Sequence, residues 1–433
     1  MRGYHLPGAH VRTERFRVGS VDVDVPRLAP AELRAIADAG RGAAVRYLRS
    51  RSLDDVLTAI DRVVANWLTP TEPVRHLANA LLPKATGFSP AMIAHGLPLL
   101  LQPLRADAIR ALLESEVGAR RANAPTLTMH VLSGNIPGLG AAPMVFGLAL
   151  GSAALIKSAA ADPLFPALFA GSVSAVDGGL GQCLAVTYWR GGDPIEDVAF
   201  AVADLVVASG SDAAIAALAA RVPGRFIGYG HRVSFAAIGA ECLGDTAVAG
   251  RLARRLAYDI SLWDQHGCLS PQLCYVEPTG RIAPAHFAEL LAEALAQYAV
   301  ELPPRRLSLE EQTAVLGFRQ ETEWSDATTL LASSGTTEWS ISLHSAPVFL
   351  PTCLNRCVRL AIIEDLRDLG MLLGPHRRFL EGAGLAVGAN RYAALAEMLA
   401  RSGVHHVSAI GRMQLPSLAW RQGGLPRIGA WVE

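Results

Sequence analysis

The sequence predicts an α/β protein built on parallel sheets, and two observations support this prediction. Between residues 126 and 221, short apolar stretches typical of strands alternate with longer stretches typical of helices. Glycine recurs where the expected strands end, a pattern typical of an open parallel sheet that binds a nucleotide at the carboxyl ends of its strands. After residues 225–230 the pattern starts again, which predicts a second α/β domain.

The region before residue 126 is expected to be mainly helical. Residues 16–25 alternate apolar and polar side chains, which predicts a short strand or hairpin. Apolar residues at three- and four-residue spacing predict helices over residues 31–48, 54–68 and 105–117. Because this region has no glycine-rich loop and no acidic pair, it indicates architecture rather than chemistry.

In the first alternating region, the expected strands are residues 127–132, 153–157, 184–189 and 205–208. The helices expected between and after them are residues 140–150, 163–176, 195–202 and 212–221. In the second region, we expect strands at 233–238, 272–277, 339–343, 348–349 and 404–410, and helices at 246–263, 286–298, 308–321 and 357–369. Residues 325–339 are polar and threonine-rich, which suggests a loop or an edge hairpin.

Composition limits the classes of function. The chain has 433 residues, with 39 basic and 39 acidic side chains, so no charge excess favours nucleic acid or a cationic partner. Its six cysteines are irregularly spaced, which favours reduced thiols over a disulfide framework. No apolar stretch reaches the roughly 20 residues that span a bilayer, and residues 1–5 do not resemble a signal peptide. We therefore expect a cytoplasmic protein.

Residues 264–271, Asp-Gln-His-Gly-Cys-Leu-Ser-Pro, place Cys268 between an expected helix and an expected strand. A thiol at such a junction can lie near backbone N–H groups that favour its anionic form, which is the nucleophile. A free cysteine is more often an inert, buried residue, and on this stretch alone that interpretation comes first. His266 either helps lower the pKa of the thiol or serves only as a turn residue.

Polar residues follow the expected strands of the first region. Asn135 either caps the local backbone or donates its amide N–H to a substrate oxygen. Lys157 is either a solvated charge or a group that reaches the ribose of a nucleotide. The candidate cofactor-binding residues at these turns are Lys157, Ser158, Gly192, Ser209, Gly210, Ser211 and Gly230. No G-x-G-x-x-G motif follows any expected strand, so a nucleotide would need another geometry.

Two other chemistries find little support. Cys353 and Cys357 have no second ligand pair, and the adjacent His405 and His406 point to opposite faces of a strand. We therefore expect no metal site. The motif G-x-S-x-G does not occur, which argues against a serine hydrolase.

Six stretches, in this order, resemble the LuxC-type acyl-CoA reductases, a branch of the aldehyde dehydrogenase superfamily that includes the fatty-acyl reductase of bacterial bioluminescence. They are residues 130–138, 155–165, 188–193, 226–235, 264–271 and 415–428, and the resemblance covers about residues 125–433. It implies an aldehyde-dehydrogenase-like fold with a helical N-terminal region and nucleotide-binding domain (1–229), a catalytic domain carrying Cys268 (230–402) and a C-terminal segment (403–433). This segment returns to the nucleotide-binding domain or joins an oligomer interface.

The resemblance also implies roles. Cys268 matches the family's nucleophile, and Asn135 the asparagine beside the acyl oxygen. Lys157 matches the lysine near the adenine ribose, and Ser211 the turn under the pyrophosphate. The implied cofactor is NADPH, with NADH as the alternative. The implied partners are an acyl-CoA or acyl-carrier-protein substrate, an acyl-activating enzyme and further copies of the chain in a homo-oligomer.

One departure from the superfamily is informative. Hydrolytic aldehyde dehydrogenases carry a glutamate in a Glu-Leu-Gly-Gly segment, whereas the matching residues 227–231 contain no carboxylate. Without a base to activate water, an acyl-enzyme would survive for hydride or thiol. The sequence therefore predicts reduction of an acyl thioester to an aldehyde. An aldehyde dehydrogenase and a non-catalytic subunit that holds an acyl chain are the alternatives.

Overall fold

The computed structural model describes residues 1–432, which form two compact units. The first unit contains residues 1–231 and 417–419 and the C-terminal residues from 425. The second unit contains residues 232–416 and 420–424. The functional division expected from the sequence, into residues 1–229, 230–402 and 403–433, stays a prediction.

The N-terminal part of the first unit is a hairpin followed by helices, as expected. Strands β1 (Arg12–Val18) and β2 (Val21–Arg27) pair antiparallel. The helices are α1 (Pro30–Ala44), α2 (Leu53–Leu68), α3 (Pro73–Thr86), α4 (Pro90–Leu101) and α5 (Ala106–Glu116). Trp67 of α2 is fully buried, and its indole N–H donates to Ser172 Oγ at 2.8 Å, which ties these helices to the α/β part of the unit.

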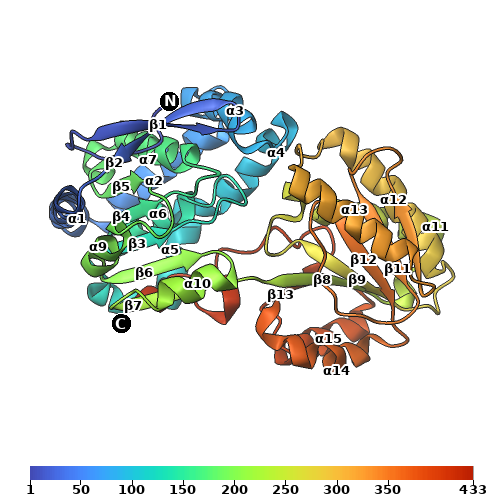
Figure 1. Ribbon diagram of the computed structural model, residues 1–433. Helices are drawn as coiled ribbons and strands as arrows, with labels where there is room; N and C mark the ends of the chain where they lie inside the picture. Colours follow the sequence, from blue (N-terminus) through green and yellow to red (C-terminus); the bar gives the residue numbers. More distant parts are fainter. Residues whose placement is uncertain (433) are drawn as a thin grey trace. The chain divides into compact units, whose positions relative to one another are not determined.

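A five-stranded parallel sheet forms the centre of the first unit (Figure 1). Its order is β5 (Leu184–Thr187), β4 (Ala153–Lys157), β3 (Leu127–Val131), β6 (Leu205–Ser209) and β7 (Arg225–Tyr229). The connecting helices are α6 (Ala141–Leu150), α7 (Leu164–Val176), α8 (Gly178–Gly181), α9 (Ile195–Val202) and α10 (Asp212–Ala219). The strand order reverses between β3 and β6, and sheets of this kind bind ligands at the carboxyl ends beside such a reversal.

The second unit is built on a seven-stranded sheet. Its order is β10 (Thr328–Ala332), β11 (Ser340–His344), β12 (Cys357–Ile362), β9 (Pro271–Val276), β8 (Val233–Ile238), β13 (Leu380–Ala386) and β14 (His406–Ala409). Only β10 is antiparallel to its neighbour. The central strands are buried on both faces, since every residue of β8 and β9 is buried.

Helices cover both faces of this sheet (Figure 1). Those on one face are α11 (Thr246–Ser261) and α12 (Pro284–Glu301), and those on the other are α14 (Leu369–Leu373) and α15 (Ala389–Arg401). Helix α13 (Leu309–Glu323) packs against β10 and β11. The expected helix over residues 357–369 is wrong, because this stretch begins with strand β12. A strand buried on both faces lacks the alternation that would have identified it.

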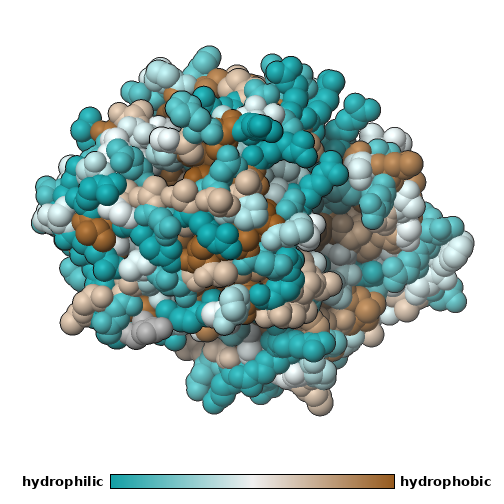
Figure 2. All heavy atoms as spheres, turned by 60° about the vertical axis from the view of Figure 1, so that its left-hand side comes forward, coloured by the Kyte–Doolittle hydropathy of each residue, from teal (hydrophilic) through white to brown (hydrophobic). Residues whose placement is uncertain are grey.

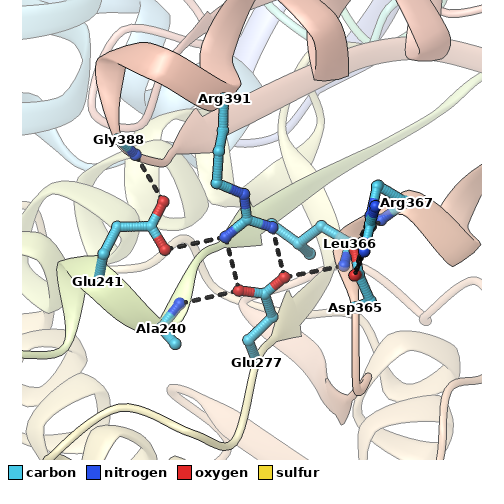
Figure 3. Close-up of polar contacts among 8 residues, drawn as sticks. All are labelled: Ala240, Glu241, Glu277, Asp365, Leu366, Arg367, Gly388 and Arg391. Atoms are coloured by element: carbon cyan, nitrogen blue, oxygen red, sulfur yellow. Dashed lines mark hydrogen bonds and ion pairs between the residues drawn. The ribbon is translucent and has the colours of Figure 1, made fainter.

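A buried carboxylate connects the carboxyl ends of β8 and β9 to helix α15 (Figure 3). Glu277 follows β9 and accepts two hydrogen bonds from the Arg391 guanidinium, at 2.8 and 2.6 Å. It also accepts from the N–H groups of Ala240 (3.0 Å) and Leu366 (2.9 Å). Glu241 accepts from the same guanidinium at 2.9 Å. We call Glu241, Glu277 and Arg391 the carboxyl-end clamp.

We expect Arg391→Ala to lower the free energy of unfolding by about 2–4 kcal/mol, because Glu277 then keeps a buried charge without its cation. Burial by itself would raise the pKa of Glu277, but the hydrogen bonds from Arg391, Leu366 and Ala240 outweigh it and leave the pKa below its usual value. The contribution is therefore present above the ordinary pKa of glutamate and is lost in acid. Urea unfolding at pH 7 and pH 4 measures both effects.

The control is Arg401→Ala, which removes an exposed ion pair with Glu397. Exposed pairs of this kind contribute about 0–1 kcal/mol. Equal losses in the two variants would contradict a stabilising clamp.

The molecular face drawn in Figure 2 is mainly hydrophilic, with smaller groups of hydrophobic side chains between the polar ones. Within residues 1–432, no helix is both long enough and apolar enough to cross a bilayer.

Candidate active site

Cys268 lies in the second unit, in the loop of residues 262–270 between α11 and β9, which we call the Cys268 loop. The residue is partly exposed. Its carbonyl oxygen accepts a hydrogen bond from the Ser234 hydroxyl at 2.7 Å. Ser234 Oγ in turn accepts a hydrogen bond from the N–H of Gly382 at 2.9 Å. A Cβ atom on Gly382 would lie only 2.7 Å from Leu269 Cδ2, so a larger residue there would force the Leu269 side chain to shift.

Two left-handed backbone segments hold this loop. Residues 263–265 have φ values of 55°, 50° and 65°, and residues 354–356 have values of 62°, 54° and 59°. None of the six is glycine, so each adopts a sparsely populated conformation that the surrounding contacts must stabilise. The N–H of Asn355 donates to the carbonyl oxygen of Asp264 at 3.1 Å.

A fully buried ion pair joins the same two segments. Arg356 Nε and Nη2 both lie 2.7 Å from Asp264 Oδ1, and the two side chains are 0% and 1% exposed. The other carboxylate oxygen of Asp264 accepts from the N–H of Arg305 at 2.9 Å. The start of the Cys268 loop is thus fixed by a charge pair between residues 92 positions apart.

The Nε2 atom of His266 faces the left-handed segment of residues 354–356. This atom accepts from Arg305 Nε at 3.2 Å and lies 3.2 Å from Asn355 Oδ1. Burial lowers the pKa of His266, and the positive charge of Arg305 lowers it further. These surroundings favour a neutral imidazole that positions the loop. The expected effect of His266 on the thiol pKa stays a prediction.

Asp259 of α11 supports the loop from the other side. Its carbonyl oxygen accepts from Ser270 Oγ and Gln414 Nε2, both at 2.7 Å. Its carboxyl oxygens accept from the N–H groups of Gly411 at 2.5 Å and Met413 at 3.2 Å. Asp259 therefore links the loop to the segment that follows β14. Burial raises the pKa of this carboxyl to about 7, against the effect of these two N–H groups.

This raised pKa predicts a pH dependence of stability. The folded protein holds the proton of Asp259 at pH values where the unfolded chain has lost it, so its contribution is full below about pH 4 and lost as the pH rises through about 7. We expect Asp259→Asn to flatten the decrease in urea midpoint between pH 5 and pH 8. Unfolding curves at several pH values test this, and parallel profiles for the two proteins would contradict it.

A pocket of about 280 Å³ opens beside Asp264, Arg305 and Asn355. Its other lining residues include Arg306 and Gln312. Sequence reasoning missed this pocket, because its residues come from four separate segments and form no motif.

In the first unit, Asn135 is an exposed residue of the loop between β3 and α6. Its side-chain oxygen accepts from Ser133 Oγ at 2.7 Å, which sets the orientation of the amide. A Cβ on Gly134 would lie 2.8 Å from the Cβ of Ala159, so this glycine allows the loop to approach the segment after β4.

Lys157 and Ser158 lie at the carboxyl end of β4. Burial lowers the pKa of Lys157, while the charge of Glu196 raises it. The hydroxyls of Ser158 and of Thr187, at the end of β5, are buried and have no hydrogen-bond partner among residues 1–432. Thr187 was not predicted from the sequence. Unsatisfied buried hydroxyls fit a site whose remaining partner is a polar ligand.

The other candidate residues form turns at the same edge. Gly192 has φ = 84° and donates its N–H to Glu196 at 3.0 Å. Gly210, after Ser209, donates its N–H to Tyr229 at 3.1 Å. Ser211 Oγ accepts from the N–H of Ala214 at 3.2 Å, so its hydroxyl caps α10.

Gly230 has a steric role. A Cβ at this position would lie 2.2 Å from Asp212 Oδ1, which accepts from the N–H of His231 at 2.7 Å. The structure thus brings the candidates of the first unit to the carboxyl edge of one sheet, and places Cys268 and His266 on the other sheet.

Several solved structures with this fold are named as aldehyde dehydrogenases. Aldehyde dehydrogenase 21 from Physcomitrella patens aligns with a TM-score of 0.75 and 14% identity, covering 98% of this chain and 92% of that one. The NADP-dependent glyceraldehyde-3-phosphate dehydrogenase from Bacillus halodurans aligns with a TM-score of 0.71 and 12% identity, covering 92% and 87%. The chain therefore has the aldehyde dehydrogenase fold, as expected from the sequence.

Within this fold class, the family model described as acyl-CoA reductase (LuxC) matches residues 48–425, and the chain belongs to this family. The long-chain acyl-protein thioester reductase of Vibrio harveyi is 22% identical over 354 residues, which cover 76% of this chain and 72% of that protein. The reductase of the same name from Photorhabdus luminescens is 26% identical over 252 residues, which cover 56% of this chain and 50% of that protein.

Proposed function

We propose that this protein reduces an acyl thioester to an aldehyde through an acyl-enzyme formed on Cys268. The family match over residues 48–425 carries this proposal, because it includes the whole Cys268 loop. The related reductases from Vibrio and Photorhabdus are named for acyl-protein thioesters, and the family for acyl-CoA. The substrate class is thus an acyl group carried on a thiol of coenzyme A or of a protein.

In the first step, the Cys268 thiolate attacks the thioester carbonyl. A new carbon–sulfur bond forms to Cys268, the bond to the carrier sulfur breaks, and the carrier leaves as a thiolate. The N–H of Cys268 and the amide of Asn135 are the donors that we assign to the oxyanion of the tetrahedral intermediate. One such donor contributes roughly 3–4 kcal/mol to lowering the barrier.

The edge of the first sheet fits a nicotinamide nucleotide. Lys157 offers a cation, Ser158 and Thr187 offer unsatisfied hydroxyls, and the strand order reverses at β3 and β6. When bound, the reduced nucleotide supplies the hydride that converts the acyl group on Cys268 to an aldehyde and restores the thiolate. We assign NADPH ahead of NADH, because Lys157 can pair with a 2′-phosphate. The Bacillus relative in fold was solved with NADP.

Oxidation of an aldehyde to an acid is the second candidate, and one contact bears on it. Residues 227–231 contain no carboxylate, but Asp212 Oδ1 accepts from the N–H of His231. Asp212 therefore brings a carboxylate to the stretch from which sequence reasoning expected none. Free acid formed from an aldehyde without a thiol acceptor would support this second function, and its absence would support the reductase.

Intact-mass measurement tests the proposal directly. After incubation with a panel of acyl-CoAs in the absence of nucleotide, we expect a mass increase equal to one acyl group, located on Cys268 by peptide mapping. Addition of NADPH should remove the adduct and release an aldehyde. A protein that stays unacylated with every thioester, or is acylated elsewhere, would overturn the mechanism.

A further inference from the structure

Two cysteines flank the left-handed segment 354–356 that holds the Cys268 loop. Cys353 is partly exposed, whereas Cys357 at the start of β12 is buried. The N–H of Cys357 donates to the carbonyl oxygen of Leu354 at 3.1 Å, so the segment closes a single tight turn between the two cysteines. Both side chains pack with Val315 and Phe318 of α13.

The two side chains lie one turn apart and against the same residues of α13. The thiol of Cys357 donates a hydrogen bond to Cys353, which lowers the pKa of Cys353 and raises that of Cys357. Cys353 is therefore both the more exposed thiol and the one whose pKa is lowered. Such a pair, a reactive thiol next to a resolving thiol, is the usual arrangement in redox-sensing proteins. Within residues 1–432, no group of three or more metal-ligating side chains offers the pair a role in metal binding.

We propose that Cys353 and Cys357 form a redox-sensitive dithiol that a hydroperoxide converts into a disulfide. The Cys353 thiolate attacks the peroxide, which gives a sulfenic acid and leaves an alcohol or water after protonation. The Cys357 sulfur then attacks the sulfenic sulfur, a sulfur–sulfur bond forms and water leaves. Two electrons pass from the thiols to the peroxide, and a dithiol reductant reverses the reaction.

The disulfide would alter the support of the Cys268 loop. A sulfur–sulfur bond of about 2.05 Å fixes the separation of the two side chains, so it constrains the turn between the cysteines. This turn carries Asn355 and Arg356, which contact Asp264 and His266. Disulfide formation goes beyond the proposed function and does not depend on it, whereas an effect on turnover rests on the role of Cys268.

The first experiment asks whether the bond forms. The full-length protein is treated with equimolar hydrogen peroxide, unreacted thiols are alkylated after denaturation, and peptides are mapped by mass. We expect a linked peptide pair at Cys353 and Cys357, with a loss of two hydrogens that a dithiol reductant reverses. The same link should form in Cys268→Ala and be absent in Cys353→Ser. If both thiols stay alkylatable, or oxidise separately to sulfinic acids, the proposal is overturned.

The second experiment asks what the bond does to Cys268. We expect its alkylation by iodoacetamide in the folded protein to change on the order of tenfold after oxidation, since shifts of about 1 Å in a reactive constellation alter rates by up to about 100-fold. Cys353→Ser serves as the matched control, because any change that persists in it comes from oxidation of Cys268 itself. Equal changes in the two proteins would overturn the link between the dithiol and the Cys268 loop. They would leave the proposed reductase function intact.

Discussion

Replacement of Cys268 with alanine is expected to lower thioester-dependent NADPH oxidation by about 10³-fold or more, because no acyl-enzyme can form without the sulfur nucleophile. The side chain is partly exposed on a loop held by Ser234 and Gly382, so its removal leaves these supporting contacts in place. The measurement is the initial rate of absorbance loss at saturating acyl-CoA, together with the mass of the protein after incubation without nucleotide.

The matched control is Cys242→Ala, which removes another partly exposed thiol of the second unit. Its rate should stay within about twofold of the unaltered protein, because Cys242 follows the carboxyl end of β8, whereas Cys268 precedes the amino end of the neighbouring parallel strand β9. Undiminished turnover in Cys268→Ala, or equal losses in the two variants, would contradict a nucleophilic Cys268.

Arg356→Met is expected to lower the free energy of unfolding by about 3–5 kcal/mol, since it leaves the Asp264 carboxylate buried without its cation. The two side chains are 0% and 1% exposed, so water cannot replace the lost contact. Urea unfolding measures the loss, and the rate of Cys268 alkylation in the folded variant reports any displacement of the loop.

The double variant Asp264→Asn with Arg356→Met separates the charge from the packing. If the lone buried carboxylate causes the loss, neutralising it should recover a large part of the stability. If Arg356→Met lowers the free energy of unfolding by less than about 1 kcal/mol, the pair is no stronger than an exposed ion pair. That result would contradict its role in holding the Cys268 loop.

Local patterns predicted much of the fold. The apolar stretch at residues 272–277 corresponds to β9 (Pro271–Val276), and the helix expected at 308–321 corresponds to α13 (Leu309–Glu323). These elements are recognisable because periodicity and flanking turns depend only on neighbouring residues. The position of Cys268 directly before a strand could be predicted in the same way.

Features that depend on distant partners could not be predicted. Asp264 and Arg356 are 92 positions apart, and only the folded sheet brings them together. The left-handed segments contain no glycine to signal their backbone conformation, since tertiary contacts stabilise it. Thr187 ends an ordinary apolar strand, and its buried hydroxyl stands out only when its neighbours are known.

Strand β9 separates the Cys268 loop from the carboxyl-end clamp. The Cys268 loop precedes its amino end and the carboxyl-end clamp follows its other end, so about 20 Å of buried strand lies between them. Substitutions around Arg391 that alter stability should therefore leave the contacts of the Cys268 loop unchanged. A library of substitutions at the carboxyl end of β9 is a way to find more stable variants whose turnover is preserved.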